Sequence, residues 1–341
     1  MNQSYQPPFT ITSAIIGLIS TISEKLGMLA ALEDETGLRL RRVNRIRTIQ
    51  GSLAIEGNTL SQAQITAILD GKRVTAPPRE VQEARNAIKA YEQLSRWQPA
   101  DEKHLLRAHQ ILMTDLIDDA GHYRSGNVGV MSGDTVIHMA PPSKRIPRLM
   151  GDLLSWLNST DQHPLITSTV FHYEFEFIHP FADGNGRMGR LWQTLILSRW
   201  NPLFALLPVE SMVHSHQQAY YQAINSSTQQ TDTAPFIEFM LEVILETIDD
   251  NTPAPTPQVS PQVSPQVSKL ITVLSKSKSA MNRAGLQQAL ALKDRHSFRE
   301  RYLKPALVAG LIEMTIADKP NSRLQQYQLT ARGKELADRF S

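Results

Sequence analysis

Residues 256–268 read TPQVSPQVSPQVS, a repeat of Pro, Gln, Val and Ser with a period of four, directly after a Pro-rich stretch at 252–255. Proline lacks the backbone N–H that a helix needs and fixes φ, so a proline in every repeat predicts an extended, polyproline-like linker. Such a linker divides the 341-residue chain into two parts that fold separately. We therefore expect a first domain at 1–251, a linker at 252–268 and a second domain at 269–341.

The charge of the chain is divided unevenly between these parts. The formal net charge of +2 conceals −6 for residues 1–268 and +8 for residues 269–341. A small basic module beside a mildly acidic domain indicates an anionic partner such as DNA for the module. The chain contains no cysteine, which excludes disulfides, Cys-ligated zinc and Cys nucleophiles and fits a cytoplasmic location.

The first domain is predicted to be a mainly helical bundle. Apolar residues recur every three or four positions from Leu40 to Leu53, which indicates a helix that ends at Gly57. The exception is residues 128–139, where β-branched residues flank a Ser-Gly-Asp turn and predict a small hairpin. A further helix is expected after Pro77 and Pro78, through 81–91, and others at 101–117, 143–158, 164–178, 187–199 and 235–247.

The apolar stretch at residues 11–22 is predicted to be an amphipathic core helix. No Lys or Arg precedes it, as a leader would require, and it is shorter than the about 20 apolar residues that cross a bilayer. We therefore expect no membrane partner.

The second domain is predicted to contain three helices, at 269–274, 283–291 and 295–309, followed by strands at 311–316 and 325–329 and a short helix at 331–340. This order is that of a winged helix, whose third helix normally enters the major groove of DNA. Basic residues on that helix and in the following loop favour such a role; they are Arg299, Arg301, Lys304, Lys319 and Arg323, with Ser297 beside them.

The segment that carries chemistry is residues 179–190, HPFADGNGRMGR, between two predicted helices. Backbone amides at Gly184 and Gly186, at the start of a helix, form a positive concavity that suits phosphate oxygens. Arg187 and Arg190 are three residues apart on that helix and share a face, so they offer two guanidinium groups to a polyphosphate.

Two further side chains of the segment complete a transfer site. Asp183 supplies a hard carboxylate oxygen for Mg²⁺ shared with phosphates. His179 titrates near neutrality and can accept a proton from an attacking hydroxyl. A base, a metal carboxylate, an anion site and two arginines indicate nucleotide phosphate transfer.

This segment resembles the signature of the Fic (filamentation induced by cyclic AMP) family, H-P-F-x-[D/E]-G-N-G-R-x-x-R, at every position. The resemblance implies an AMP transferase that moves the adenylyl group of ATP to a Ser, Thr or Tyr hydroxyl of a target protein and releases pyrophosphate. It gives His179 the role of base, Phe181 that of core anchor and Asp183 that of Mg²⁺ ligand. By the same resemblance the ATP site comprises Phe181, Asp183, the anion hole Gly184, Asn185 and Gly186 around the α-phosphate, Arg187 and Arg190 on the β- and γ-phosphates, and Tyr221.

Residues 52–58, SLAIEGN, resemble the inhibitory motif of the same family, [S/T]-x-x-x-E-[G/N]. Glu56 lies in the last turn of its helix, where the dipole disfavours a carboxylate by roughly 0.3–1 kcal/mol, so a compensating cation is expected. Ser52 lies four residues earlier on the same face and can steady Glu56. The resemblance implies that Glu56 pairs with Arg190 and obstructs the γ-phosphate. The alternative is a solvated glutamate before a glycine cap.

Three further interpretations concern the surroundings of this segment. The hairpin resembles the family's flap, which pairs with an extended segment of the target through Val136, Ile137, His138 and Met139; alternatively it only covers the core. Tyr221 either stacks on adenine or fills the core. His214 and His216 lack further ligands nearby and are expected to be surface histidines.

Two classes of function follow. The first is an autoinhibited protein adenylyltransferase that uses ATP and Mg²⁺, modifies a target protein or itself, and also removes AMP in one variant of the hypothesis. The second is a nucleotide-responsive, DNA-binding transcriptional regulator that acts through residues 269–341. Phosphocholine or phosphate transfer is disfavoured because the signature is unaltered. The target and the oligomeric state, a homodimer included, stay open.

Overall fold

Two helices form the centre of the first unit, and both are buried on all sides. In α7 (Pro164–Ile178) every residue from 165 to 175 is buried, and in α8 (Asn185–Trp200) so is every residue from 187 to 197. A helix that is buried all round must be covered by other elements. The short loop that joins these two helices is the first half of the HPFADGNGRMGR segment.

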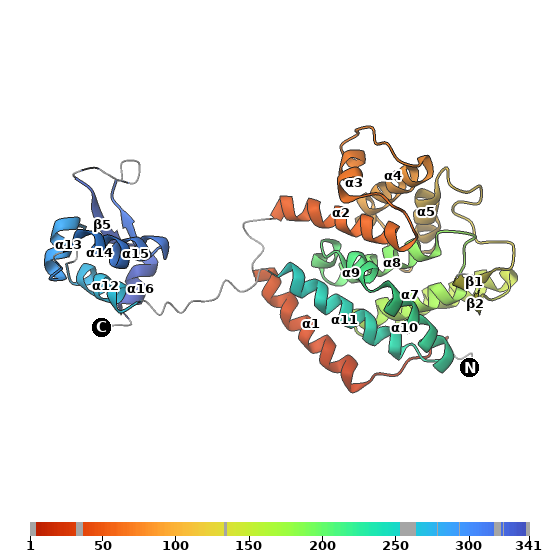
Figure 1. Ribbon diagram of the computed structural model, residues 1–341. Helices are drawn as coiled ribbons and strands as arrows, with labels where there is room; N and C mark the ends of the chain where they lie inside the picture. Colours follow the sequence, from red (N-terminus) through yellow and green to blue (C-terminus); the bar gives the residue numbers. More distant parts are fainter. Residues whose placement is uncertain are drawn as a thin grey trace. The chain divides into compact units, whose positions relative to one another are not determined.

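The computed structural model describes residues 5–31, 37–132, 135–252, 264–277, 279–292, 294–316, 322 and 324–338. The chain divides into two units, Met1–Pro253 and Ala254–Ser341. Helices dominate both, and strands form one two-stranded and one three-stranded sheet (Figure 1). The predicted fold class, mainly helical with a small hairpin, is confirmed.

The outer helices of the first unit pack in pairs around α7 and α8. α1 (Ser13–Ala31) lies along α11 (Ala234–Asn251), and α2 (Gly37–Ile55) packs against α9 (Val209–Ser215), as Figure 1 shows for the first pair. The other helices are α3 (Gln62–Leu69), α4 (Pro78–Glu92), α5 (Glu102–Met113), α6 (Ile146–Ser159) and α10 (Gln217–Gln230), with short 3-10 helices η1 (Leu94–Arg96), η2 (Ser143–Arg145) and η3 (Pro202–Ala205).

α1 is the core helix predicted from residues 11–22. Its residues Ile15, Ile22 and Leu26 are buried in the core of the first unit. Among the described residues, no helix is long and apolar enough to cross a membrane.

The predicted hairpin is formed by β1 (Gly129–Ser132) and β2 (Thr135–Met139). The two strands are antiparallel, and their register shifts between Val130 and Met131, which marks a β-bulge. Helices α3 and α9 were not predicted, because they are too short to give a clear helical period.

The first helix of the second unit begins within the repeat. α12 (Pro265–Ser277) starts four residues before the predicted Lys269, so the last PQVS belongs to the helix and not to the linker. Proline is tolerated in a first helical turn, where its missing N–H would have no acceptor. Val267 is buried in the core of this unit, and that burial explains why the helix extends into the repeat.

The predicted third helix, 295–309, is interrupted. It consists of α14 (Arg295–Phe298), the π-helix η4 (Arg299–Leu303) and α15 (Lys304–Val308). Pro305 cannot donate to the carbonyl four residues earlier and its ring crowds that carbonyl, which accounts for the wider π turn before it.

Three strands complete the second unit. β3 (Met281–Asn282), β4 (Ile312–Met314) and β5 (Gln326–Leu329) form an antiparallel sheet in the order β3-β5-β4, with α13 (Arg283–Ala289) and α16 (Ala331–Asp338) beside them in sequence. β3 has only two residues and was not predicted. Lys319 and Arg323 of the predicted wing lie outside the described residues, and the winged-helix assignment stays a prediction.

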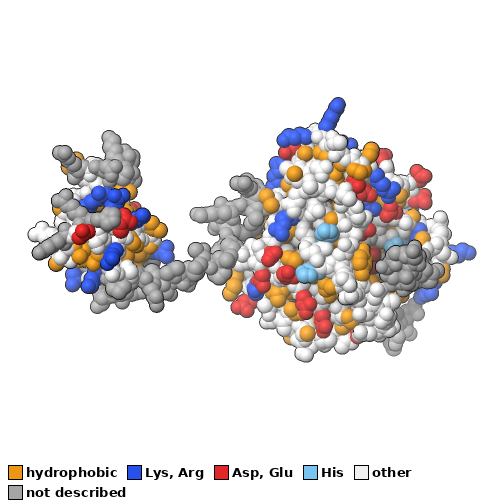
Figure 2. All heavy atoms as spheres, in the orientation of Figure 1, with side chains coloured by type: hydrophobic (Ala, Val, Ile, Leu, Met, Phe, Trp, Pro, Cys, Tyr) orange, Lys and Arg blue, Asp and Glu red, His pale blue; other side chains and the backbone are white. Residues whose placement is uncertain are grey.

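The basic charge of the second unit is interspersed with acidic side chains. Figure 2 shows Asp and Glu side chains next to Lys and Arg on the face in view. Glu300 lies 3.3 Å from Lys304 and 3.9 Å from Arg299 on the segment predicted to read DNA. These pairs reduce the positive charge that this segment offers to a phosphate backbone.

The packing of α2 on α9 predicts a large effect for a small substitution. A Cβ at Gly51 would lie 2.5 Å from the backbone nitrogen of Ser211, so Gly51→Ala must push the two helices apart. We expect it to lower the free energy of unfolding by about 1–3 kcal/mol. All four tryptophans lie in the first unit, so urea unfolding followed by tryptophan fluorescence measures this unit alone.

Gly17→Ala is the matched control for Gly51→Ala. A Cβ at Gly17 of α1 meets no atom within 4 Å, and alanine favours a helix over glycine by roughly 0.5–1 kcal/mol. The control should therefore be at least as stable as the parent. Equal stability of the Gly51 and Gly17 variants would contradict the close approach of α2 and α9.

Candidate active site

The loop between α7 and α8 reverses the chain over residues 179–184. His179 ends α7 in the left-handed region at φ 50°, and Gly184 precedes α8 at φ 84°. Glycine adopts this conformation without steric cost. A Cβ at Gly184 would also lie 2.6 Å from Met113 Sδ, so both the backbone and the packing require glycine here.

Phe181 holds the middle of the loop in the core. Its side chain is fully buried and stacks on His109 with ring centroids 3.6 Å apart and planes 4° from parallel. This packing supports the predicted role of Phe181 as a core anchor, and its predicted contact with ATP stays a prediction.

His109 holds the end of the loop that Phe181 does not reach. Its Nδ1 accepts from the N–H of Gly121 at 2.8 Å, so Nε2 carries the proton and donates to the carbonyl of Asp183 at 3.0 Å. Burial lowers the pKa of His109 to about 4, which keeps the ring neutral at physiological pH.

The side chain of Asn185 closes the loop on itself. Its Oδ1 accepts from the N–H of Phe181 and its Nδ2 donates to the carbonyl of Phe181, both at 2.9 Å. Because both ends of the amide are used, Asn185 contributes only its backbone to the predicted anion hole. The first amides of α8, like those of any helix, have no intrahelical acceptor, and they supply the anion site.

Arg190 is buried one turn into α8 and contacts two residues of α2 and its C-terminal turn. Its Nη2 lies 2.6 Å from Glu56 Oε1 and donates to the carbonyl of Ser52 at 3.0 Å, while its Nε donates to Ser52 Oγ at 3.2 Å. Burial alone would lower the pKa of Arg190, but Glu56, Tyr220 and Glu176 together raise it. Arg190 is therefore a buried cation.

Ser52 acts on Arg190 and not, as predicted, on Glu56. Ser52 is buried and both of its oxygens accept from the guanidinium. Because they are four residues apart, Ser52 and Glu56 both contact the guanidinium of Arg190.

The carboxylate of Glu56 also covers the first turn of α8. A Cβ at Gly186 would lie 2.3 Å from Glu56 Oε1 and 3.0 Å from Arg190 Nη1. The carboxylate therefore lies at the helix N-terminus, where an anion is favoured by the dipole and by the free amides. One carboxylate therefore lies beside the first turn of α8 and pairs with the guanidinium of Arg190.

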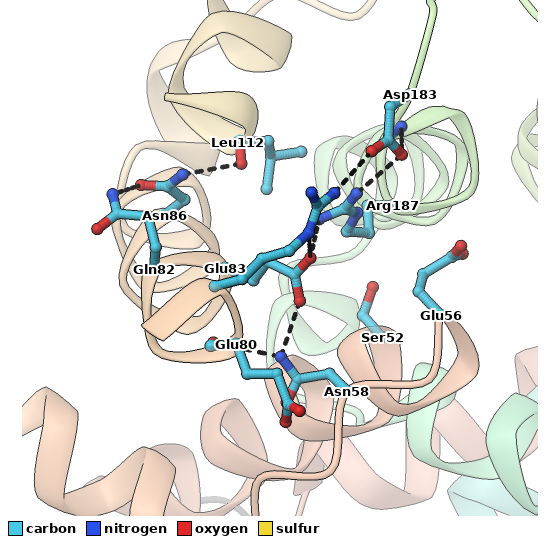
Figure 3. A network of polar contacts seen from close by, with 12 residues as sticks. Ser52, Glu56, Asn58, Glu80, Gln82, Glu83, Asn86, Leu112, Asp183 and Arg187 are labelled. Carbon is cyan, nitrogen blue, oxygen red and sulfur yellow. Dashed lines mark hydrogen bonds and ion pairs between the residues drawn. The ribbon is translucent and has the colours of Figure 1, made fainter. Parts of the chain in front are cut away.

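Arg187 belongs to a second polar network, drawn in Figure 3. Its Nη2 lies 3.1 Å from Asp183 Oδ1, and its Nη1 lies 3.5 Å from Glu83 Oε1 of α4. Glu83 also accepts from Asn58 Nδ2 at 2.9 Å, and Arg79 Nη2 lies 3.1 Å from Asp183 Oδ2. The predicted metal carboxylate and the predicted phosphate arginine are thus paired with each other.

Comparison with known proteins identifies the family. Residues 99–197 match the model of the Fic/DOC family, and residues 265–330 match that of the filamentation induced by cAMP protein Fic-like, C-terminal domain. A crystal structure of a Fic family protein from Desulfovibrio desulfuricans G20 is 50% identical, covers 96% of this chain and 99% of that chain, and superposes with a TM-score of 0.71. The chain belongs to the Fic family.

More distant relatives share the Fic region. Proteins named protein adenylyltransferase Fic from Nematostella vectensis and Aedes aegypti are each 29% identical, over 56% and 65% of this chain. The match spans 45% of the length of each of these relatives. The structure of Fic-1 (aa134–508) from C. elegans has 22% identity, covers 70% of each chain and has a TM-score of 0.55, which shows a common fold.

The neighbouring tyrosines of this Fic protein have different environments. Tyr220 is buried and its hydroxyl lies 3.1 Å from His172 Nε2, whereas Tyr221 is 39% exposed. The partial exposure of Tyr221 does not fit the core-filling alternative, and its contact with adenine stays a prediction.

The predicted docking strand is β2 of the hairpin. Its backbone pairs with β1, with Val136 opposite Met131 and His138 opposite Val130. The side chains of Val136, Ile137, His138 and Met139 lie outside the described part of the chain, and their role stays a prediction.

His214 and His216 were expected to be surface histidines. Within the described residues no group of three or more His, Asp or Glu side chains is arranged to hold a metal ion. His216 instead lies 2.9 Å from Glu246 at the surface.

We call residues 179–190 the Fic loop. Sequence reasoning missed three residues near it, which are His109, Glu83 and Glu176. His109 and Glu83 gave no signal because their partners are distant in sequence. Glu176, one turn before His179, did give one, since it is a charged residue in the apolar run FHYEFEFI. A carboxylate in a core helix requires a reason.

Glu176 is a second carboxylate behind the Fic loop. Its Oε1 is buried without a hydrogen-bond partner among the described residues and lies 3.8 Å from His172 Nε2. Burial raises the pKa of Glu176 to about 7; the charge of Arg190 opposes this shift and that of Glu56 adds to it. Glu176 is therefore expected to bind a proton over much of the acidic range.

This pKa predicts how stability depends on pH. Above about pH 4.5 the unfolded chain loses the proton of Glu176 while the folded protein keeps it up to about pH 7. Glu176 therefore makes the free energy of unfolding fall as pH rises through this window, by at most about 1.4 kcal/mol per pH unit. Glu176→Gln should remove this part of the fall, measured by urea unfolding between pH 4.5 and 7.5.

Glu24→Gln, at an exposed position of α1, is the control for this measurement. It should keep the pH profile of the parent. A constant difference in unfolding free energy between the parent and Glu176→Gln across this pH range would contradict the raised pKa.

Proposed function

We propose that this Fic protein is a protein adenylyltransferase that Glu56 inhibits. It transfers AMP from ATP to a Ser, Thr or Tyr hydroxyl of a target protein, which can be the chain itself. The observation that carries the proposal is the Fic loop, where His179, Asp183, the N-terminus of α8 and two buried arginines lie within twelve residues. The names of the animal relatives, protein adenylyltransferase Fic, support it.

The chemistry assigns a task to each part of the loop. His179 takes the proton of the target hydroxyl, and the hydroxyl oxygen then attacks the α-phosphorus of ATP. The bond from the α-phosphorus to the oxygen that bridges to the β-phosphate breaks, and pyrophosphate leaves. The free amides at the start of α8 stabilise the negative charge that develops on the α-phosphate oxygens.

Asp183 is the residue that would hold Mg²⁺. Its side chain is 40% exposed at the edge of the loop, and one carboxylate together with substrate phosphates is a usual Mg²⁺ environment, so the donor set fits the ion. When bound, Mg²⁺ neutralises phosphate charge. Arg187 and Arg79, which pair with Asp183 without ligand, would then be free to contact the phosphates.

Inhibition follows from the position of the Glu56 carboxylate. It uses the guanidinium of Arg190 that would otherwise bind the γ-phosphate, and it lies against Gly186 at the anion site. Like charges repel, so a polyphosphate in this pose competes with Glu56. Removing the carboxylate should therefore raise activity.

We expect Glu56→Gly to raise incorporation of AMP by about tenfold or more, since each 1.4 kcal/mol of competing interaction is a factor of ten. The assay is transfer of label from α-labelled ATP with Mg²⁺, with the protein alone and in lysate, and mass spectrometry of the labelled peptide. His179→Ala in the Glu56→Gly protein should lower the rate by about a hundredfold or more.

Asp70→Asn is the control for Glu56→Gly. It breaks the exposed ion pair of Arg42 on α2 without touching the Fic loop, so labelling should stay at the parent level. The proposal is wrong if the Glu56→Gly protein incorporates no AMP, or if His179→Ala leaves incorporation intact. Pre-modified target incubated with and without ATP separates transfer from removal of AMP.

The comparisons do not favour the DNA-binding alternative. They give no support to DNA contact through residues 269–341 or to a homodimer, and the pairs of Glu300 with Lys304 and Arg299 weaken the electrostatic case for DNA. We propose neither.

A further inference from the structure

A buried arginine outside the Fic signature contacts the start of the Fic loop. Arg124 is 4% exposed and lies between α5 and the hairpin. Its Nε donates to the carbonyl of His179 at 2.7 Å, and its Nη2 lies 3.5 Å from the carbonyl of Ile178. Its own backbone N–H donates to the carbonyl of Pro180 at 2.9 Å. One residue thus satisfies three consecutive carbonyls at the end of α7.

The same guanidinium holds both ends of the hairpin. Nη1 of Arg124 donates to the carbonyl of Gly126, before β1, and Nη2 donates to the carbonyl of Pro141, after β2, both at 2.6 Å. The two carbonyls are the points at which the chain enters and leaves the hairpin. Arg124 therefore joins the base of the hairpin to the backbone of His179 through a single rigid group.

Arg124 differs from Arg187 and Arg190 in its counter-charge. The two signature arginines pair with carboxylates, whereas Arg124 has no carboxylate within ion-pair distance among the described side chains. Burial lowers its pKa, and the dipoles of carbonyls at the negative end of α7 and at the base of the hairpin compensate its charge. With its donors engaged by carbonyls, Arg124 is placed to hold backbone, not a phosphate.

The remainder of the loop is held by other groups. His109 binds the carbonyl of Asp183, and Asn185 closes the loop on Phe181. The second half of the loop, from Phe181 to the start of α8, therefore does not depend on Arg124; we call it the phosphate-facing half. The half that does depend on it carries the left-handed His179, a conformation that persists only where surrounding contacts fix it.

We propose that Arg124 is a positioning residue that fixes the imidazole of His179 relative to the hairpin, so that a target strand docked on the hairpin presents its hydroxyl to the base. This inference rests on the proposed transferase function. It predicts that losing Arg124 slows transfer to the target and leaves ATP binding almost unchanged.

The kinetic test uses the Glu56→Gly protein as background. Arg124→Ala should lower kcat for AMP transfer by about tenfold to a hundredfold, because misplacing a reacting group costs this much. The Kd for Mg·ATP, measured by calorimetry, should change by less than about threefold, since the phosphate-facing half of the loop has its own supports. Arg124→Lys keeps the positive charge and can keep one hydrogen bond, so its kcat should lie between that of Arg124→Ala and that of the background protein.

Arg199→Ala is the matched control. Arg199 also donates to backbone carbonyls, those of Ser95 and Trp97, but at the far end of α8. It should leave kcat and the Kd for Mg·ATP at background values. Equal losses of kcat and ATP affinity in Arg124→Ala, or an unchanged kcat in both Arg124 variants, would overturn the proposal.

A second readout does not require activity. In the full chain without ATP, Arg124→Ala or Arg124→Lys should speed amide hydrogen exchange at residues 126–142 and 177–182, and Arg199→Ala should not. Unchanged exchange in these segments would also overturn the inference. If the Glu56→Gly protein transfers no AMP at all, the transferase function fails, and exchange alone then decides the role of Arg124.

Discussion

The buried guanidinium of Arg190 is the constraint on which the first unit depends. A cation in the interior, only 2% of its side chain exposed, requires an anion and hydrogen-bond acceptors. α2 supplies both, through Ser52 and the turn that carries Glu56. The contact of Gly51 with α9 brings α2 close enough for this pairing. The proposed inhibition therefore uses the same interaction that compensates the buried charge of Arg190, and a ligand that replaces Glu56 must provide an equivalent anion.

The Fic loop is held so that its two halves have separate supports. His109, Phe181 and Asn185 are neutral groups that fix the phosphate-facing half from below, which leaves the amides of α8 open to an anion. Arg124 fixes the half that carries His179. In the proposed reaction this division would let different parts of the fold position the base and the nucleotide, one of which also holds the hairpin.

Local sequence signals predicted much of this arrangement, and tertiary contacts account for what they missed. The turn-forming residues at 183–187 predicted the turn before α8, and apolar periodicity predicted α7 and α8. The side chain of Asn185 and the partner of Ser52 could not be predicted, because each depends on which atom comes within hydrogen-bond distance after folding. The predicted start of α12 was wrong because the burial of Val267 favours a helix that extends into the proline repeat.

The central claim is that Glu56 and the terminal phosphate of ATP compete for Arg190, and nucleotide affinity tests it most directly. The measurement is the Kd of ATP and of AMP, each with Mg²⁺, for the parent and for Glu56→Gly. Removal of Glu56 should lower the Kd of ATP by about tenfold or more. Because AMP lacks the β- and γ-phosphates, its Kd should change by less than about twofold. An equal change for both nucleotides, or no change for ATP, would contradict the account.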